Sequence, residues 1–179
     1  MALTKTPVCD FGKKAEDFKL KSIENKIISL NDIKGKKATL IMFICNHCPY
    51  VKAIIKDLAK DCNQLKKDGI NSVAIMSNDT KNYPEDSFDN MIKFAKANNF
   101  GEINYLIDET QEIARKYGAV CTPDFFGYNK DLKLQYRGRF RELKDLKPIL
   151  SGDSDLKIAM KMISKTQAGP KEQTPSMGC

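Results

Sequence analysis

Two cysteines three residues apart, Cys45 and Cys48, constrain the fold of this chain more than any other feature of its sequence. The residues from 38 to 44 before them are almost all apolar, and a helical periodicity of apolar residues begins at Pro49. The sequence therefore predicts a buried strand that runs directly into a helix, with the cysteine pair at the junction. The first turn of a helix has unpaired N–H groups and the positive end of the helix dipole, and both stabilise a thiolate. We therefore predict a redox-active dithiol within a βαβ unit.

The four residues of this motif are assigned different roles. The thiolate is the nucleophile in disulfide exchange, and we expect Cys45 to be the exposed, attacking sulfur and Cys48, one turn into the helix, to be the buried, resolving sulfur. His47 is the single histidine of the chain. It is expected to donate to the Cys45 thiolate or to stabilise it by charge, which would raise the reduction potential above that of thioredoxin. The alternative is that His47 is an exposed turn residue. Asn46 and Pro49 are supporting residues, and Pro49 suits the first helical position.

Periodicity and turn residues predict the remaining elements. Strands are predicted at residues 17–20, 27–30, 38–44, 70–76, 103–107, 124–128 and 132–136. Helices are predicted from 49 to a stop at Gly69, from about 84 to 98, at 112–117 and at 154–164. We expect one domain spanning residues 1–179, with an irregular tail from about 165 that is either a mobile end or a strap laid over the domain. The order of elements resembles the thioredoxin-like α/β fold, a central mixed β-sheet flanked by helices, here with an N-terminal extension and an inserted helix.

A proline at the start of the predicted hairpin supplies the second half of the candidate site. Pro123 follows Thr122 and opens an apolar strand, where its missing N–H is tolerated. The thioredoxin-like resemblance implies that this proline is cis and faces the dithiol. Its role would be to hold the Thr122 backbone beside Cys45, where it can pair with an extended substrate and keep metal ions off the dithiol. The alternative is a trans proline at a strand entry. Cys121 is either a third redox partner or a packing residue.

Composition and charge narrow the classes of function. The chain has six cysteines with one closely spaced pair, which argues against a disulfide scaffold, and Cys62 lies on the apolar helix stripe as a core thiol. We find no apolar leader and no apolar run long enough to span a bilayer, so we expect a cytoplasmic protein with no membrane partner. The net charge of +7 comes mostly from scattered lysines, which predicts a solvated basic surface. Residues 136–141 are arginine-rich, but we interpret them as an exposed strand face and expect no nucleic-acid partner.

Several longer motifs carry a family resemblance. They are Gly12-x-x-Ala15-x-Asp17-Phe18-x-Leu20, Phe43-x-Cys45-Asn-His-Cys-Pro-Tyr-Val-Lys52, Ser77-Asn-Asp79, Tyr83-Pro-x-Asp86, Tyr105-Leu-x-Asp-Glu-Thr-Gln111, Tyr117-Gly-Ala-Val-Cys-Thr-Pro-Asp124 and Tyr136-Arg-Gly-Arg139. This set resembles the peroxiredoxin-like branch of the thioredoxin superfamily, the bacterial alkyl hydroperoxide reductase/thiol-specific antioxidant family. Residues 175–179 are similar to that family's tail, which commonly continues for a few residues, so whether the C-terminus is complete is left open.

The resemblance implies an oxidoreductase with an antioxidant or redox-homeostasis role. We expect a thiol–disulfide oxidoreductase with catalytic Cys45 and Cys48, and no cofactor or bound metal. Its partners would be a disulfide-bonded protein or small molecule and a reductant that regenerates the dithiol; a homodimer is left open.

Two alternatives remain. The first is a thiol peroxidase. Peroxiredoxins, however, use a Pro-x-x-x-Thr-x-x-Cys motif and an arginine from elsewhere; here Cys45 occupies the threonine position, residues 41–44 hold no proline, and no arginine sits where that motif places one. The second is a non-catalytic metal-handling or redox-sensing domain. Cys45, Cys48 and His47 suit Cu(I) but fall short of a closed four-ligand zinc site.

Overall fold

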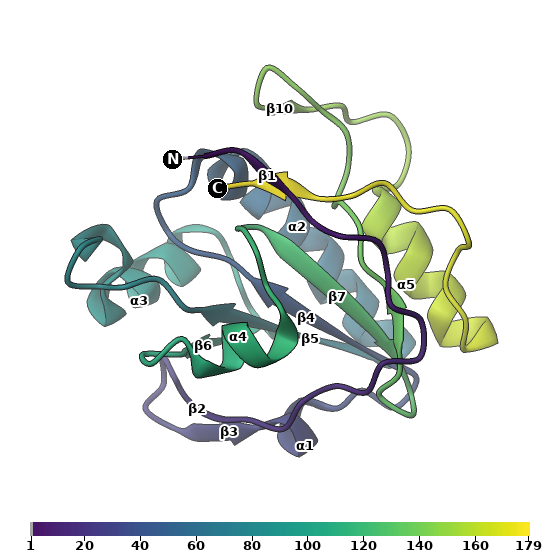
Figure 1. Cartoon of the computed structure of the whole chain (residues 1–179), viewed down its shortest axis with the longest axis horizontal. Coiled ribbons are helices and arrows are strands. Elements are labelled where there is room, and N and C mark those ends of the chain that lie inside the picture. The colour runs from purple at the N-terminus through teal and green to yellow at the C-terminus, as the bar shows by residue number, and fades with distance from the viewer. Residues whose placement is uncertain (1) are drawn as a thin grey trace.

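The computed structural model describes residues 2–179 and is built on a seven-stranded sheet with the order β3-β2-β6-β5-β4-β7-β8 (Figure 1). The strands are β2 Lys19–Ser22, β3 Ile27–Ser29, β4 Ala38–Phe43, β5 Ile70–Met76, β6 Asn104–Ile107, β7 Asp124–Asn129 and β8 Leu134–Tyr136. The central strands β4, β5 and β6 run parallel, whereas the β2–β3 and β7–β8 hairpins pair antiparallel at the two edges. The sheet is therefore mixed, as the sequence predicts.

Strand β4 lies in the middle of the core because it is apolar on both of its faces. All six of its residues are buried. Leu40 and Met42 point into one hydrophobic cluster, and Ile41 and Phe43 point into a second cluster on the opposite side of the sheet. This alternation is the period of two that a strand imposes on its side chains. The dithiol motif is therefore attached to a strand that is fixed from both sides.

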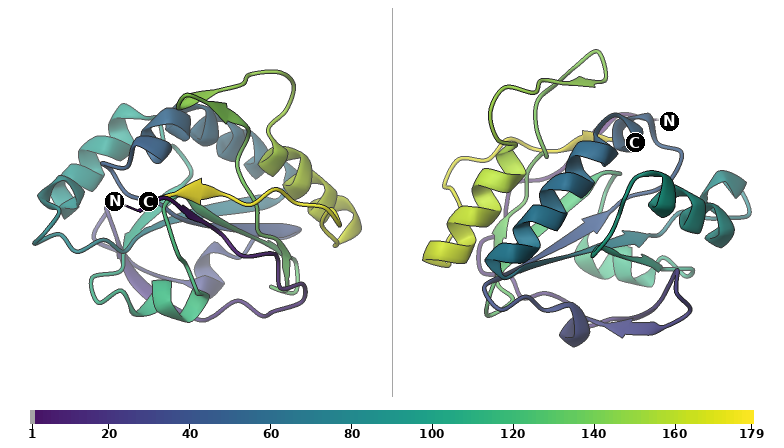
Figure 2. Two further views of the ribbon diagram at one scale, coloured as in Figure 1. Left: turned by 45° about the horizontal axis from the view of Figure 1, so that its top comes forward. Right: turned by 180° about the vertical axis from the view of Figure 1, so that it is seen from behind.

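Helices cover both faces of the sheet (Figure 2). The helices are α1 Leu30–Ile33, α2 Pro49–Leu65, α3 Phe88–Ala97, α4 Glu112–Tyr117 and α5 Asp155–Thr166, with 3₁₀ turns η1 Lys66–Asp68 and η2 Pro84–Asp86. Residues of α2, α3 and α5 pack in the cluster that contains Leu40, while residues of α1 and α4 pack in the cluster that contains Phe43. This arrangement is the thioredoxin-like fold, and none of the helices in residues 2–179 has the length and apolarity needed to cross a membrane.

The predicted strands and helices occur in the predicted order, but helix α1 was not predicted: it begins at Leu30, which we placed at the end of a strand. The other differences also lie in segments with weak local signals. Two short sheets were not predicted: β1 Thr4–Lys5 pairs with β11 Met177–Gly178, and β9 Leu143–Lys144 pairs with β10 Lys147–Pro148. The tail lies across the domain as a strap beside the N-terminal segment (Figure 1).

The arginine-rich segment is not the exposed strand face that we predicted. Strand β8 ends at Tyr136, and the side chains of Arg137 and Arg141 are buried. Each guanidinium group has a carboxylate partner, Asp124 for Arg137 and Asp57 for Arg141. These two arginines are therefore not part of the exposed basic surface. Each can be buried because an aspartate compensates its charge.

Candidate redox site

The dithiol lies at the carboxyl end of β4, where the chain leaves the sheet and enters α2. The Ile44 N–H still donates to Ile75 O at 3.0 Å, which extends the β4–β5 pairing up to the motif. Cys48 is the N-cap of α2 and Pro49 is its first helical residue, so Cys48 is not one turn into the helix as predicted. Cys45 and Cys48 are each 1% exposed, and the prediction that Cys45 is the exposed sulfur is therefore wrong.

A loop that is distant in sequence closes the other side of the dithiol. The Thr122–Pro123 peptide bond is cis. The Cys48 thiol donates to Thr122 O at 3.3 Å, and Cys45 Sγ lies 3.5 Å from Thr122 Oγ1. Both thiols are free. The structure thus brings the four predicted residues Cys45, Cys48, Thr122 and Pro123 into one site.

Local hydrogen bonds make the two thiols different from one another. A hydrogen bond from Cys45 lowers the pKa of Cys48 to about 5, and contacts with Thr122 and with N–H groups in the first turn of α2 act in the same direction. The pKa of Cys45 is raised, first by its hydrogen bond with Cys48, then by burial and by the negative charge of Asp86. A sulfur at a helix N-terminus is the better place for a negative charge. The local charges therefore favour Cys48 as the thiolate, the reverse of the predicted order of attack.

Asp86 organises the loop that carries the cysteines, and we did not predict this role from the sequence. Its carboxylate is fully buried and accepts hydrogen bonds from the Asn46 N–H at 2.7 Å, from His47 Nδ1 at 2.6 Å and from Asn78 Nδ2 at 2.9 Å. Asp86 lies in η2, about forty residues along the chain from the motif it contacts. The one sequence signal was its place in the Tyr83-Pro-x-Asp86 resemblance, which does not state a contact.

The histidine of the motif faces this carboxylate and not the expected thiol. His47 Nδ1 bonds to Asp86, and the imidazole stacks on the Tyr83 ring with centroids 5.1 Å apart. Its Nε2 atom is buried and has no hydrogen-bond partner among residues 2–179. Nδ1 is thus engaged by Asp86 and does not donate to Cys45. A ring nitrogen of His47 lies within 4.8 Å of Cys45 Sγ, so stabilisation of a Cys45 thiolate by charge, and the higher reduction potential expected from it, stay predictions.

Asn46 anchors the same loop from the inside. Its side chain accepts a hydrogen bond from the Tyr105 hydroxyl at 2.8 Å and donates one to Glu85 O at 3.2 Å. Because Tyr105 lies on β6 and is fully buried, this contact ties the motif to the sheet two strands away from β4. Asn46 is thus a positioning residue for the dithiol.

The other two buried cysteines, Cys62 and Cys121, are packing residues: each is buried, and each has a raised pKa. Cys62 is buried on α2, and desolvation raises its pKa to about 12. Cys121 is buried with its Sγ 3.7 Å from Pro123 O, and its pKa is also raised to about 12, first by burial and then by the charge of Asp124. Both features favour the packing alternative for Cys121.

Metal-binding residues are grouped differently from the set that we predicted. Ligand atoms of Cys45, His47 and Asp86 lie within 4.8 Å of one another, and Cys48 is not in this group. A cysteine, a histidine and a carboxylate could hold a divalent ion, but a closed tetrahedral zinc site needs a fourth ligand. His47 Nδ1 is also already hydrogen-bonded to Asp86, so an ion at this place would have to break that contact.

Three of the arginines are engaged with aspartates away from the thiols. Arg137 pairs with Asp124 at 2.9 Å, Arg139 with Asp155 at 2.6 Å and Arg141 with Asp57 at 3.1 Å. Arg115 lines a cavity of about 260 Å³ that also contains Thr122, and its guanidinium donates to Thr110 O at 2.8 Å. None of these contacts polarises a peroxide bond beside Cys48 in the way that a peroxidase requires.

Comparison with known proteins agrees with this architecture. The chain is similar along its full length to an uncharacterised conserved protein from Geobacillus kaustophilus, with 38% identity, coverage of 100% of this chain and 95% of that one, and a TM-score of 0.94. A hypothetical protein from Sinorhizobium meliloti 1021 is 35% identical, with coverage of 98% and 96% and a TM-score of 0.90.

A more distant neighbour shares the fold alone. It is the thioredoxin domain of a thiol-disulfide oxidoreductase from Bacteroides vulgatus, 18% identical, with coverage of 71% of this chain and 86% of that one and a TM-score of 0.60. No curated protein matches the sequence. The model of the AhpC/TSA family matches residues 11–137, which include the dithiol, Asp86 and the cis proline. Together with the thioredoxin-like fold this match supports a redox function, and the chain belongs to the AhpC/TSA family.

Proposed function

We propose that the protein is a thiol–disulfide oxidoreductase that acts through Cys45 and Cys48 on a disulfide-bonded protein or small molecule. The observation that carries the proposal is the position of both thiols against one residue, Thr122, at the N-terminus of a helix. In that environment the hydrogen bond from Cys45 and the N–H groups of the first turn of α2 lower the pKa of Cys48, which favours its thiolate form. A thiolate with a second thiol beside it is the minimum needed for disulfide exchange.

The reaction follows from the different environments of the two sulfurs. The Cys48 thiolate attacks one sulfur of the substrate disulfide, and the other substrate sulfur leaves as a thiolate. Cys45 then loses its proton and attacks Cys48, which releases the second substrate thiolate and forms the Cys45–Cys48 disulfide. An external thiol reductant returns the pair to the dithiol. The sequence favoured Cys45 as the attacking sulfur, and the local charges favour Cys48.

A groove next to the cis proline offers a place for substrate side chains. It is a cavity of about 450 Å³ on one side of Pro123. Its apolar lining comes from Tyr50, Ile54, Phe125, Phe140, Leu143 and Leu146. Lys5, Arg139 and Asp145 also contribute to its lining. A largely apolar cavity suits side chains that flank a cysteine in a polypeptide, so the proposal favours peptide or protein disulfides over small charged ones.

Insulin reduction with dithiothreitol as the electron donor tests the proposal. We expect Cys48→Ser and Cys45→Ser each to lose about 1,000-fold in rate, because each removes a sulfur that the reaction needs. Cys62→Ser is the matched control, since it removes a thiol from the same helix without touching the site. Mixed disulfides trapped on the two single variants identify the attacking sulfur. Rates for Cys45→Ser and Cys48→Ser equal to the wild-type rate would refute the proposal.

A further inference from the structure

The C-terminal strap crosses the cis-proline loop at the dithiol. Cys179 O accepts from the Thr122 N–H at 3.0 Å, and the Cys179 N–H donates to Thr122 O at 3.2 Å. The Ser176 hydroxyl donates to Pro123 O at 2.7 Å. Figure 2 shows the strap ending beside the start of α2, in both views. Both backbone groups of Thr122 that an extended substrate was expected to use are thus occupied by Cys179.

This pairing brings a third sulfur to the dithiol. The Cys48 thiol and the Cys179 N–H converge on the same acceptor, Thr122 O, at 3.3 Å and 3.2 Å. The Cys179 side chain packs against the cluster that holds Cys45 and Cys48, and its thiol is near enough for Cys48 to raise its pKa. Cys179 is half-buried, so it is more accessible than either residue of the dithiol.

The strap is held in place by the N-terminal segment. Gly178 pairs with Thr4, and the Ser176 N–H donates to the Thr6 hydroxyl at 3.0 Å. A Cβ on Gly178 would lie 1.9 Å from Thr122 O, so this close approach requires glycine. The position of Cys179 is therefore fixed by contacts on both sides of the strap.

We propose that Cys179 is a third redox-active cysteine, which accepts the disulfide from the Cys45–Cys48 pair by bonding to Cys48. The proposal rests on the proposed function, because Cys48 must first become part of a disulfide. In this proposal the strap acts as an intramolecular substrate: Cys179 pairs with the Thr122 backbone, and its sulfur reacts with Cys48.

The exchange is balanced without any further reactant. Starting from the Cys45–Cys48 disulfide, the Cys179 thiol loses its proton and its sulfur attacks Cys48 Sγ. The new Cys48–Cys179 bond forms as the Cys45–Cys48 bond breaks, and Cys45 leaves as a thiolate that takes up a proton. The number of disulfides is unchanged, and the step moves the oxidised state from the core of the site to the half-buried strap.

The charge on Cys48 sets the order of these events. Burial raises the pKa of Cys179, and the negative charge of the Cys48 thiolate raises it further. While Cys48 is reduced, Cys179 therefore stays protonated and unreactive. Once Cys48 enters a disulfide its charge is gone, and Cys179 ionises more readily. Cys179 is thus a better nucleophile when a disulfide lies beside it than when Cys48 is a thiolate, while burial raises its pKa in both states.

Disulfide mapping by mass spectrometry tests the proposal on the full chain. Cys45→Ser is treated with oxidised glutathione, which can oxidise Cys48 to a mixed disulfide. We expect a Cys48–Cys179 bond with release of glutathione, in about tenfold excess over glutathionylated Cys48, because a tethered thiol acts at millimolar effective concentration. In Cys45→Ser combined with Cys179→Ser, glutathione should stay on Cys48. Persistent glutathione on Cys48 of Cys45→Ser, or unreacted Cys48 and Cys179, would overturn the proposal.

Two further variants separate this proposal from the proposed function. Gly178→Ala keeps all three sulfurs but forces the strap off Thr122; placed in the Cys45→Ser background, it should lower the yield of the Cys48–Cys179 bond about tenfold. Cys179→Ser alone should still form the Cys45–Cys48 disulfide and reduce insulin. If Cys179→Ser does both and Cys45→Ser forms no Cys48–Cys179 bond, the role of Cys179 fails while the proposed function stands. If Cys179→Ser forms no Cys45–Cys48 disulfide under oxidation, the proposed function fails first.

Discussion

Two buried aspartates follow neighbouring parallel strands, and they have different roles. Asp108 comes directly after β6 and is 1% exposed, while Asp86 lies in η2 after β5 and is fully buried. The Asp108 carboxylate accepts from the Ser77 hydroxyl at 2.8 Å and from the N–H groups of Ile113 and Ala114 at 3.3 and 3.0 Å. It therefore holds the first turn of α4, a structural task, whereas Asp86 holds the loop of the dithiol.

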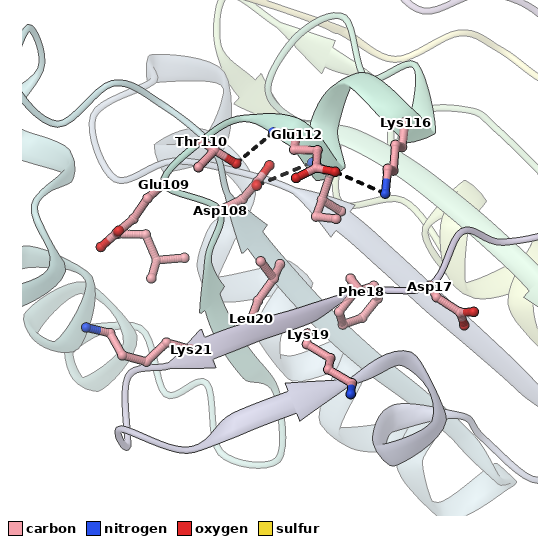
Figure 3. A pocket seen from close by; sticks show the side chains of 12 residues that line it. Asp17, Phe18, Lys19, Leu20, Lys21, Asp108, Glu109, Thr110, Glu112 and Lys116 are labelled. Carbon is pink, nitrogen blue, oxygen red and sulfur yellow. Dashed lines mark hydrogen bonds and ion pairs between the residues drawn. The ribbon is translucent and has the colours of Figure 1, made fainter.

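The surroundings of the two carboxylates also differ. Asp108 lines a cavity of about 620 Å³ between β2 and α4, larger than the groove next to the cis proline Pro123 (Figure 3). Its charged lining mixes both signs, from Asp17, Lys19, Lys21, Glu109, Glu112 and Lys116, and it contains no thiol or histidine. At Asp86, by contrast, the buried His47 Nε2 has no hydrogen-bond partner among residues 2–179, and ligand atoms of Cys45, His47 and Asp86 lie within 4.8 Å of one another. The size of a cavity therefore does not locate the chemistry here; the unsatisfied and reactive groups do.

Changing one carboxylate at a time to its amide is the most direct test of whether Asp86 and Asp108 have different roles. Asp86→Asn replaces a carboxylate that accepts three hydrogen bonds by a group with one acceptor oxygen, and we expect it to cost about 3 kcal/mol of the free energy of unfolding. We also expect a loss of about 100-fold in insulin reduction by the folded protein, because the dithiol loop shifts by a fraction of an ångström or more. Urea denaturation and the insulin assay measure the two effects.

Asp108→Asn is the matched control for this experiment. It also removes acceptors from a buried carboxylate, and a similar cost of about 3 kcal/mol is expected from the loss of its contacts with Ser77 and the start of α4. Insulin reduction per folded molecule should remain within about twofold of wild type, as is normal for substitutions that act only on stability. Equal losses of activity in the two variants would show that the distinction between the two aspartates is false.

The pH dependence of thiolate formation sharpens the contrast between the site and the core. With the pKa of Cys48 lowered to about 5 and that of Cys62 raised to about 12, ultraviolet thiolate absorbance should rise through about pH 5 and then stay level to about pH 9. Absorbance should rise with pH because Cys48 is ionised above its lowered pKa, and at about pH 4 its thiolate fraction should fall about tenfold. Cys48→Ser should abolish this transition, and Cys62→Ser should leave it unchanged. A first transition near pH 9 would contradict the assignment.

Local sequence signals were enough for the part of the site that is continuous in the chain. An apolar strand, two cysteines and a proline at the helix start specify the β4–α2 junction. Pro123, a weak signal by itself, was assigned to the site because it opens a strand downstream of the Cys-x-x-Cys motif in a thioredoxin-like order of elements. The order of reactivity within the dithiol was not accessible, because it depends on which sulfur reaches the helix N–H groups and which lies nearer Asp86.

Contacts between distant segments account for what the sequence did not predict. Asp86 reaches the motif from η2, and Cys179 reaches Thr122 across the strap. No periodicity or spacing in the sequence indicates either contact, because each depends on the tertiary packing of helices, strands and loops. The burial of Arg137 has the same origin, because its partner Asp124 lies across the β7–β8 hairpin.

The smallest effect is expected at the rim of the larger cavity, where Glu112 and Lys116 form an ion pair of 3.1 Å one turn apart on α4. Their side chains are 59% and 49% exposed, so water screens the pair and its loss should change the free energy of unfolding by less than about 0.5 kcal/mol. Because neither side chain lines the cavities at Thr122 and Pro123, Lys116→Ala and Glu112→Ala should both leave insulin reduction unchanged. A double-mutant cycle in urea, run beside the insulin assay, measures both quantities. If either variant slowed insulin reduction several-fold, the cavity in Figure 3 would have to take part in substrate binding. The region around Asp108 would then not be purely structural, and its contrast with the region around Asp86 would be wrong.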